Sequence, residues 1–342
     1  MDRTVIYGVL NWGLGHATRS SVIIRKLEQQ GFRPIIASDG AAGEWLQEEF
    51  PHLEYRMLQA YNIHYSRRNL QWPRLLWQIP KMAKAAHKEH EILQIWADEL
   101  KPVGIISDNR LGFHHPEVPS VYISHQLRPR MAMFSGAAAW AHRQYFKKFH
   151  EIWVPDDQDI KASGQLSKNG KARKIGLLSS LKPEESTASK IVILLSGPEP
   201  QRSILERKIF EQAEDLPEDT ILIRGTNEPC PERYRRRIKI YDRLNSLDVS
   251  RILAEAELLI SRSGYSSIMD YYKLGKKAIL IPTPGQSEQE YLARLHAASP
   301  YFLTVNQKNL KLAEQLAQAS KLKSPQPYQK DLAADLFKLF SK

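Results

Sequence analysis

Short apolar runs alternate with longer stretches of helical periodicity along the chain, and this alternation constrains the fold more than any other feature. In the first half, the runs that predict strands are Thr4–Val9, Pro34–Ala37, Val103–Ser107 and Ser120–Ile123. The stretches between or after them predict helices over Ala17–Gln29, Ala41–Glu49, Leu75–Leu100 and Ala137–Phe149. Such a rhythm is typical of a parallel sheet covered on both faces by helices.

A second series of the same kind follows in the other half of the chain. Its predicted strands are Lys190–Leu195, Thr220–Arg224, Ile238–Tyr241, Glu257–Ile260, Lys277–Ile281 and Tyr301–Val305. Its predicted helices are Ser203–Ala213, Val249–Ala256, Ser266–Leu274, Glu288–Ala297, Lys308–Ala319 and Asp331–Phe340.

The length of 342 residues exceeds what a single hydrophobic core usually serves. We therefore predict an α/β protein with two Rossmann-like, doubly wound domains that face each other across a cleft. The expected domains cover residues 1–160 and 189–323, joined by a polar linker over 161–188. Residues 324–342 form a tail whose helix packs back on the first domain. Ligands of such sheets bind at the carboxyl ends of the strands.

A glycine turn connects the first predicted strand to the first helix. Gly13 and Gly15 permit a tight backbone, and His16 follows them at the start of the helix. At a helix N-terminus the neutral, proton-accepting form of histidine is favoured, so His16 is a candidate general base. Asp108 ends another strand at the same edge, where its carboxylate is expected to orient the imidazole. The simpler alternatives are a histidine that only bonds the turn and an aspartate that only caps a loop.

A second turn follows the predicted strand Glu257–Ile260. Ser263 and Gly264 lead into the next helix, whose backbone N–H groups and dipole suit a phosphate or diphosphate. Asp270 lies further along that helix, where a carboxylate can accept hydrogen bonds from ribose hydroxyls. This arrangement predicts a nucleotide site in the second half of the chain.

Composition limits the partners and the compartment. A single cysteine, Cys230, allows no intramolecular disulfide, and the N-terminal stretch is too short for a signal peptide, so the cytoplasm is expected. The net charge is +11, and basic residues lie beside Trp72, Trp77 and Trp140. Basic residues interleaved with tryptophan suit peripheral contact with an anionic membrane at its inner face. The alternative is a solvated helix face, and no recognition motif favours nucleic acid.

The two glycine turns together resemble the nucleotide-sugar glycosyltransferases of the GT-B fold, with the closest likeness to the MurG-like group of glycosyltransferase family 28. The residues that carry this resemblance are Gly13–His16, Ser261–Gly264, Asp270 and Pro282–Glu290. The resemblance implies a metal-independent, inverting transfer of a hexose or N-acetylhexosamine from a UDP-sugar to a hydroxyl acceptor. That acceptor is a glycan, a lipid-linked sugar or a small molecule. The UDP-sugar is a co-substrate, and no cofactor is implied.

The resemblance also implies roles for individual positions. Asp270 corresponds to a ribose ligand, Gln289 and Glu290 to ligands of the donor sugar, and Leu247 to a neighbour of the base. His16 or His125 corresponds to the base, and Arg202 or Arg262 assists the departing diphosphate. The remaining implied donor contacts are Gly15, Ser196, Gly197, Ser263, Gly264 and Tyr265.

Some features depart from the family pattern or favour other readings. Pro198 and Pro200 remove two N–H donors from the loop after Gly197. The triplet Asp157-Gln158-Asp159 has the form of a metal-binding D-x-D motif, but a lone match predicts an ordinary surface loop. A nucleotide-sugar hydrolase or epimerase is the first alternative, since Gly13, Gly15, His16 and Arg19 also match a hydrolase turn. A non-catalytic sugar- or lipid-binding protein is the second.

Overall fold

The computed structural model describes residues 3–61, 72–127, 144–183 and 190–341. The chain divides near Ser180 into two compact units, and the residues from Lys330 onward return to the first unit. None of the described helices combines the length and the apolar character that a membrane crossing requires. The predicted helix Ala137–Phe149 and Trp140 lie largely or wholly outside the described residues.

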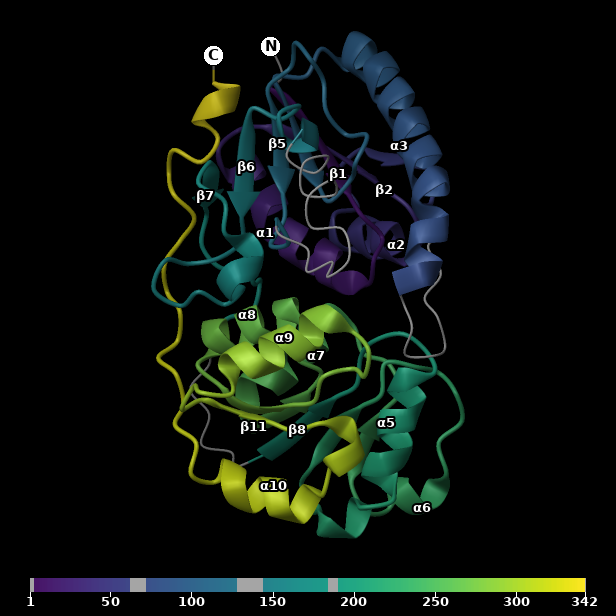
Figure 1. The fold of residues 1–342 in the computed structure, drawn as a ribbon, viewed down its shortest axis with the longest axis vertical. Helices are drawn as coiled ribbons and strands as arrows, with labels where there is room; N and C mark the ends of the chain where they lie inside the picture. The colour runs from purple at the N-terminus through teal and green to yellow at the C-terminus, as the bar shows by residue number, and fades with distance from the viewer. Residues whose placement is uncertain (1–2, 62–71, 128–143, 184–189, 342) are drawn as a thin grey trace. The chain divides into compact units, whose positions relative to one another are not determined.

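The first unit is built on a parallel sheet with the strand order β3-β2-β1-β4-β5-β6-β7, and helices lie on both of its faces (Figure 1). Its strands are β1 (Thr4–Val9), β2 (Arg33–Ser38), β3 (Tyr55–Met57), β4 (Gly104–Asp108), β5 (Ser120–Ile123), β6 (Glu151–Val154) and β7 (Ala172–Lys174). Its described helices are α1 (Leu14–Gln29), α2 (Gly40–Glu49), α3 (Trp72–Leu100) and the 3-10 turn η1 (Gly164–Ser167).

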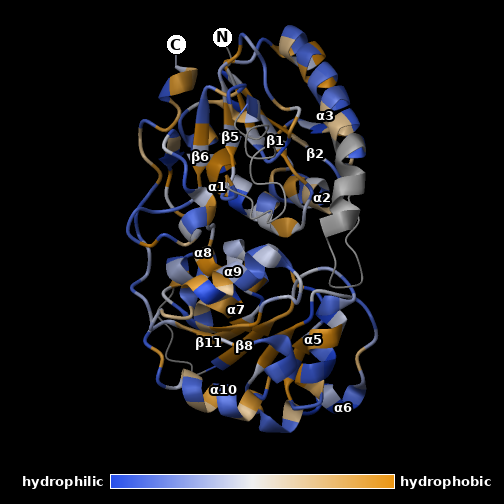
Figure 2. Ribbon diagram, in the orientation of Figure 1, coloured by the Kyte–Doolittle hydropathy of each residue, from blue (hydrophilic) through white to orange (hydrophobic). Residues whose placement is uncertain are grey.

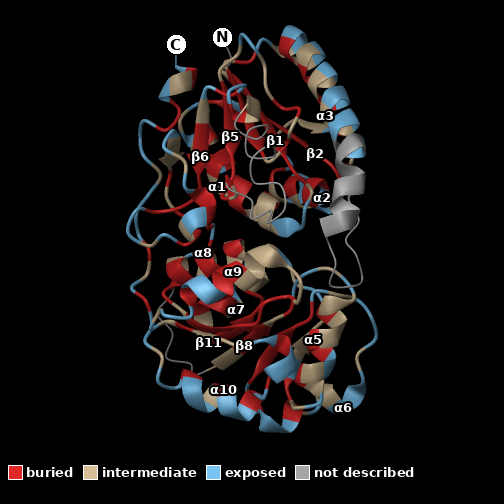
Figure 3. Ribbon diagram, viewed as in Figure 1, coloured by how far each residue is buried: buried red, intermediate tan, exposed pale blue. Residues whose placement is uncertain are grey.

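Strand β1 shows why this sheet is covered on both faces. Val5, Tyr7 and Val9 belong to the core cluster that contains the apolar side of α1. Ile6 points to the other face, where it packs in a cluster with Leu93 of α3. A strand buried on both faces reads as a continuous apolar run, which explains the hydrophobic strands in Figure 2 and their burial in Figure 3.

The second unit is built on a parallel sheet with the order β10-β9-β8-β11-β12-β13. Its strands are β8 (Lys190–Leu194), β9 (Ile221–Ile223), β10 (Lys239–Tyr241), β11 (Ala256–Ser261), β12 (Lys277–Leu280) and β13 (Phe302–Thr304). Its helices are α5 (Gln201–Phe210), α6 (Glu232–Arg235), α7 (Ser246–Glu255), α8 (Tyr265–Leu274), α9 (Ser287–His296) and α10 (Leu312–Ala319). Two 3-10 turns, η2 (Ala213–Asp215) and η3 (Gln307–Asn309), complete it.

Strand register brings the functional turns to one edge within each unit. In the first unit, Asp108 pairs with Val9 on one side and with Ile123 on the other, so β1, β4 and β5 end at the same level. In the second unit, Ser261 pairs with Leu194 and with Leu280, so β8, β11 and β12 also end together. The residues after these strands therefore form the carboxyl edge of each sheet.

The C-terminal tail differs from its prediction. The helix expected over Asp331–Phe340 is absent there, and only a 3-10 turn, η4 (Lys338–Phe340), forms after a series of turns. Phe337 and Phe340 are 1% exposed in the core of the first unit, and the ring of Phe337 lies 5.8 Å from that of Phe32. The apolar spacing that suggested a helix instead belongs to side chains that anchor the turns.

The boundary between the units also differs from the expected linker. Residues 161–180 belong to the first unit, where they supply η1 and the edge strand β7. The polar stretch from Leu181 onward begins the second unit.

Candidate active site

The glycine turn after β1 has a backbone that favours glycine. Gly13 caps α1 with φ 82°, in the left-handed region that side chains rarely adopt, and no side chain caps this helix. The Leu10 N–H donates to the Asp108 carbonyl oxygen at 3.1 Å, which ties the turn to the end of β4. Trp12 and Leu14 are 40% and 43% exposed, so this edge presents apolar surface as well.

His16 and Asp108 meet at this edge. The Nδ1 atom of His16 lies 2.8 Å from Oδ1 of Asp108. Asp108 is fully buried, whereas the His16 side chain keeps 12% of its surface exposed. A buried carboxylate that holds one ring nitrogen leaves the other nitrogen for a substrate, which is the arrangement of a carboxylate-oriented base.

A buried arginine completes the group. Arg19 lies one helical turn after His16 and is 2% exposed. Its Nε donates to Asp108 Oδ2 at 2.7 Å, and its Nη2 contacts Oδ1 of the same carboxylate. Its Nη1 lies 3.2 Å from Nδ1 of His125, which follows β5. Ser20 adds a hydroxyl donor to Asp108 at 2.9 Å.

Burial and the neighbouring charges shift the pKa values of both Asp108 and His16. Burial alone would raise the pKa of Asp108, but the Arg19 guanidinium and His16 outweigh burial and hold that pKa well below its usual range. Burial lowers the pKa of His16, and Arg19 lowers it further against the opposite effect of Asp108. Asp108 is therefore ionised at neutral pH while His16 is neutral, as a proton acceptor must be.

The corresponding edge of the second unit has two glycine turns. Gly197, after β8, has φ 99°, and Ser196 beside it is exposed. Gly264 caps α8 with φ −74°, a conformation open to any residue, and a Cβ there would meet only the Ser267 hydroxyl at 3.8 Å. The fold itself therefore does not require glycine at 264. A missing side chain leaves room for a ligand to approach the backbone at the helix start.

Arg262 lies directly before this turn and is 1% exposed. Its Nη2 donates to the Gln201 carbonyl oxygen at 2.6 Å, and its Nη1 donates to the carbonyl oxygens of Ile281 and Pro282 at 3.4 Å each. Within the described part of the chain, no carboxylate pairs with it. Burial lowers the pKa of Arg262 to about 10, so the group remains a cation at neutral pH. A buried cation held only by carbonyl dipoles favours a nearby anion.

The loop after β12 is held by two side chains of α9. Oε1 of Gln289 accepts a hydrogen bond from the Thr283 N–H at 2.9 Å, and Oε1 of Glu290 accepts one from the Gly285 N–H at 2.9 Å. The Ser263 hydroxyl donates to the Gln289 carbonyl oxygen at 2.8 Å, which joins α9 to the turn before α8. Gln289 and Glu290 therefore shape the loop with one side-chain oxygen each.

Two family models match the chain in separate segments. Residues 3–129 match a model described as glycosyl transferase family 1. Residues 211–341 match the glycosyltransferase family 28 C-terminal domain. Together these segments span most of both units.

Solved glycosyltransferases share the fold over nearly the whole chain. MurG of Acinetobacter baumannii is 13% identical, with 99% of each chain covered and a TM-score of 0.62. The spinosyn rhamnosyltransferase SpnG complexed with thymidine diphosphate is 14% identical, covering 93% of this chain and 91% of its own, with a TM-score of 0.63. The glycosyltransferase VinC in complex with dTDP is 12% identical, covering 92% and 90%, with a TM-score of 0.54.

This chain is a glycosyltransferase of the GT-B fold. Its two parallel sheets match that fold class, and residues 211–341 match the family 28 C-terminal domain.

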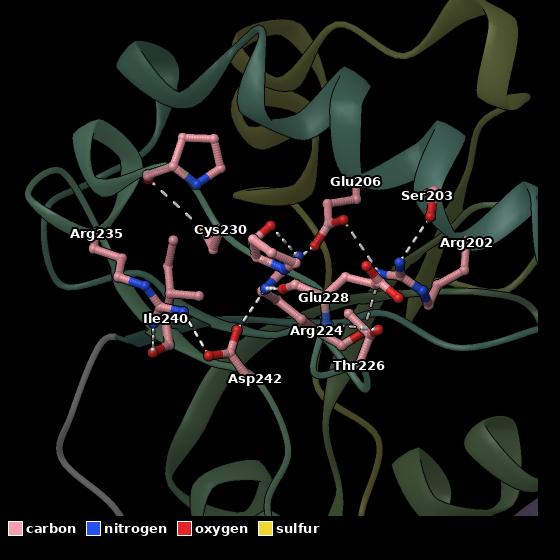
Figure 4. Close-up of polar contacts among 12 residues, drawn as sticks. Arg202, Ser203, Glu206, Arg224, Thr226, Glu228, Cys230, Arg235, Ile240 and Asp242 are labelled. Atoms are coloured by element: carbon pink, nitrogen blue, oxygen red, sulfur yellow. Dashed lines mark hydrogen bonds and ion pairs between the residues drawn. The ribbon is translucent and has the colours of Figure 1, made fainter.

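Arg202 of the glycosyltransferase belongs to a network of polar contacts that includes Glu206 and Arg224 (Figure 4). Its Nε donates to Glu199 at 2.6 Å, and its Nη1 lies 3.3 Å from Glu206. Glu206 in turn pairs with buried Arg224, whose Nη1 donates to Asp242 at 2.5 Å. Two carboxylates therefore offset the charge of Arg202, whereas no carboxylate among the described residues pairs with Arg262.

The other implied donor positions of the glycosyltransferase lie on α7 and α8. Leu247 is 75% exposed at the start of α7, which Asn245 caps by accepting the Asp248 N–H at 2.8 Å. Asp270 is half-buried on α8, and Tyr265 is 3% exposed.

The D-x-D triplet of the glycosyltransferase forms an ion pair. Lys330 donates to Asp157 Oδ2 at 3.1 Å and to Asp159 at 2.8 Å. Within the described ranges, no group of three or more His, Cys, Asp or Glu side chains is arranged so that it could hold a metal ion.

Sequence reasoning did not assign a role to Arg19 beyond its match to a hydrolase turn. The available signal was its spacing, because residues three apart share a helix face and Arg19 follows His16 at that distance.

A second buried group was also missed. Arg110 is fully buried between Asp39 at 2.8 Å and Glu89 at 3.1 Å, and Tyr61 donates to Glu89. Burial raises the pKa of Glu89 against the effect of Arg110.

Proposed function

We propose that the glycosyltransferase moves a hexose or N-acetylhexosamine from a UDP-sugar to a hydroxyl acceptor in one displacement, with inversion at the anomeric carbon. The observation that carries this proposal is the contact of 2.8 Å between His16 and the buried carboxylate of Asp108. A neutral imidazole oriented by an ionised carboxylate is the group that an acceptor hydroxyl needs to become a nucleophile.

The reaction then balances as follows. The acceptor oxygen forms a bond to the anomeric carbon, and its proton passes to Nε2 of His16. The bond between that carbon and the diphosphate oxygen breaks, and its electron pair leaves with the nucleoside diphosphate. Asp108 stabilises the imidazolium that results.

The donor is assigned to the carboxyl edge of the second unit. The backbone around Ser263, Gly264 and Tyr265 at the start of α8 binds the diphosphate, with Ser196 and Gly197 on the neighbouring turn. Arg262 supplies positive charge from within the fold, which stabilises the leaving group without a metal. Asp270 accepts from the ribose, Leu247 packs on the base, and Gln289 and Glu290 use their remaining polar atoms on the sugar.

For the nucleotide of the donor, the comparisons favour a specific second candidate. SpnG and VinC were solved with thymidine diphosphates, so a dTDP-sugar is the second candidate donor. A thermal-shift series with UDP, dTDP, GDP and CMP separates them. UDP is expected to stabilise the enzyme most, and loss of that effect in Asp270→Ala but not in exposed Asp215→Ala supports the ribose contact. Equal response to all four nucleotides argues against a specific site.

The acceptor is proposed to be a glycan, a lipid-linked sugar or a small molecule with a free hydroxyl. The tryptophans that suggest contact with the inner face of an anionic membrane fall in two places: Trp72 and Trp77 belong to α3, and Trp140 lies outside the described residues. Cosedimentation with anionic vesicles tests that contact, and the same binding to neutral vesicles would contradict an electrostatic origin.

His16→Ala tests the central assignment. We expect unchanged nucleotide affinity and transfer reduced by about 100-fold or more. His87→Ala is a matched control, because His87 is 74% exposed on α3. Wild-type transfer by His16→Ala would exclude His16 as the base. Release of free sugar from donor alone, at a rate that acceptors do not raise, would favour the hydrolase instead.

A further inference from the structure

Arg19 joins the two histidines of the site through one buried guanidinium. It approaches His125 with Nη1 at 3.2 Å and His16 with Nη2 at 2.8 Å. Its Nε and Nη2 both face the carboxylate of Asp108, which supplies the counter-charge that a buried arginine needs. One cation therefore touches both candidate bases.

The contact with His125 determines which nitrogen of that ring carries the proton. Arginine has five N–H donors and no acceptor, so a nitrogen that bonds to it must offer a lone pair. The contact is made by Nδ1 of His125, which places the proton of the neutral ring on Nε2.

The contact with Asp108 has the opposite consequence for His16. The ionised carboxylate has only acceptors, so Nδ1 of His16 at 2.8 Å forms a hydrogen bond when it carries a proton. A lone pair on Nδ1 would instead face the lone pairs of the carboxylate oxygen. The Arg19 Nη2 contact does not outweigh this, because that nitrogen is already directed at the same carboxylate oxygen.

We propose that Arg19 is a positioning residue which, together with Asp108, gives the two imidazoles opposite proton placements. His16 then presents an unprotonated Nε2, whereas His125 presents an Nε2–H group. The chemical use of this difference rests on the proposed function: His16 accepts the proton of the acceptor hydroxyl, and His125 donates a hydrogen bond to an oxygen of the sugar substrate.

This assignment gives different roles to His16, the first candidate base named from the sequence, and His125, the second. Nε2 of His125 has no lone pair while Arg19 occupies Nδ1, so it cannot take a proton. His125→Gln keeps an N–H donor and is therefore expected to retain much more transfer activity than His125→Leu. His16→Gln has no basic nitrogen and is expected to be as inactive as His16→Ala.

Long-range 1H–15N spectra of the full-length enzyme labelled with 15N-histidine test the proton placements directly. His16→Gln and His125→Gln assign the signals. We expect the Nδ1–H form for His16 and the Nε2–H form for His125 in the wild type. The Nδ1–H form at His125, or the same form at both rings, overturns the proposal. This readout needs no substrate, so it stands or fails separately from transferase activity.

Arg19→Gln tests the role of the guanidinium. We expect His125 to lose its fixed form and show a mixture of both, with Arg19→Lys restoring it in part. Arg25→Gln is the control, because Arg25 lies on the same helix, is 47% exposed and pairs with Glu49. An unchanged His125 spectrum in Arg19→Gln contradicts the role of Arg19. If that variant does not fold, the wild-type and Arg19→Lys spectra still decide the matter.

Discussion

The Nη2 atom of Arg262 donates to the carbonyl oxygen of Gln201 at 2.6 Å, and this bond joins the turn after β11 to the first residue of α5. The carbonyl oxygens of Ile281 and Pro282, after β12, bind the same guanidinium. One buried cation thus links the carboxyl ends of neighbouring strands without an acidic partner among the described residues. Its charge remains available to an anion at this edge.

Arg262→Met should therefore weaken nucleoside diphosphate binding. The side chain keeps its apolar volume but loses its charge, and each lost charged hydrogen bond is worth about 1.5–3 kcal/mol. We expect Kd for UDP to rise at least tenfold and the thermal shift by UDP to shrink. Arg251→Met, an exposed position on α7, is the control. Wild-type UDP affinity in Arg262→Met would contradict the assignment.

Gly264→Ala should separate binding from folding. The backbone conformation accepts alanine, and the new Cβ would lie an ordinary 3.8 Å from Ser267 Oγ, so we expect a melting temperature near that of the wild type. The methyl group would occupy space that a diphosphate needs, so KM for the donor should rise about tenfold or more. Gly170→Ala is the control, since nothing lies within 4 Å of a Cβ there. Unchanged donor KM places the diphosphate elsewhere.

Most of the central strands could be predicted from the sequence because both of their faces are buried, although the interior strand β6 was not. Thr4–Val9 has the expected bounds, since continuous burial produces a continuous apolar run. The edge strands Tyr55–Met57 and Ala172–Lys174 were not predicted. Each consists of three half-buried or exposed residues that include a charged side chain, and each pairs on one side only. Their strand character comes from the neighbouring strand, which local sequence does not encode.

In the site too, some residues could be predicted from the sequence and others could not. His16 and Asp108 follow from topology, because parallel strands place their carboxyl ends together. The connection from Arg19 to His125 joins residues 106 positions apart through a helix face, and spacing alone does not indicate it. The partners of Arg202 were not indicated either. Its position after a glycine turn predicts a phosphate contact, and the structure adds that Glu199 and Glu206 engage it from within the same segment.

The pH profile of kcat should extend further into acid than an ordinary histidine allows. Burial first, and then Arg19, lower the pKa of His16, while Asp108 opposes them; His125 also disfavours the charged ring. A base with a lowered pKa stays unprotonated to a lower pH, so kcat should decline only below about pH 6.5. His16 should also reduce the free energy of unfolding as the pH falls through its folded pKa, because the unfolded chain binds the proton more readily. A decline that begins above that range would contradict the shift.

Asp108→Asn should reduce kcat by about 100- to 10,000-fold, because an amide neither fixes the His16 tautomer nor stabilises the imidazolium. It also removes the counter-charge of Arg19, which is expected to cost about 3–5 kcal/mol in unfolding free energy. Asp98→Asn is the control, since Asp98 is 84% exposed on α3. Measurements of kcat are made where circular dichroism shows a folded variant. Activity within a few-fold of the wild type would exclude Asp108 from the mechanism.

Phe337→Ala should destabilise the first unit although it lies far along the chain from the strands it covers. Phe337 is 1% exposed, and its ring lies 5.8 Å from Phe32 and 5.9 Å from Trp153. Removal of a buried phenylalanine ring typically costs about 3–5 kcal/mol, since the cavity collapses only in part. Urea denaturation should show this loss, whereas exposed Lys338→Ala should change little. A loss below about 1 kcal/mol would mean that the tail contributes little to this core, because the surrounding side chains would then hold the unit together without it.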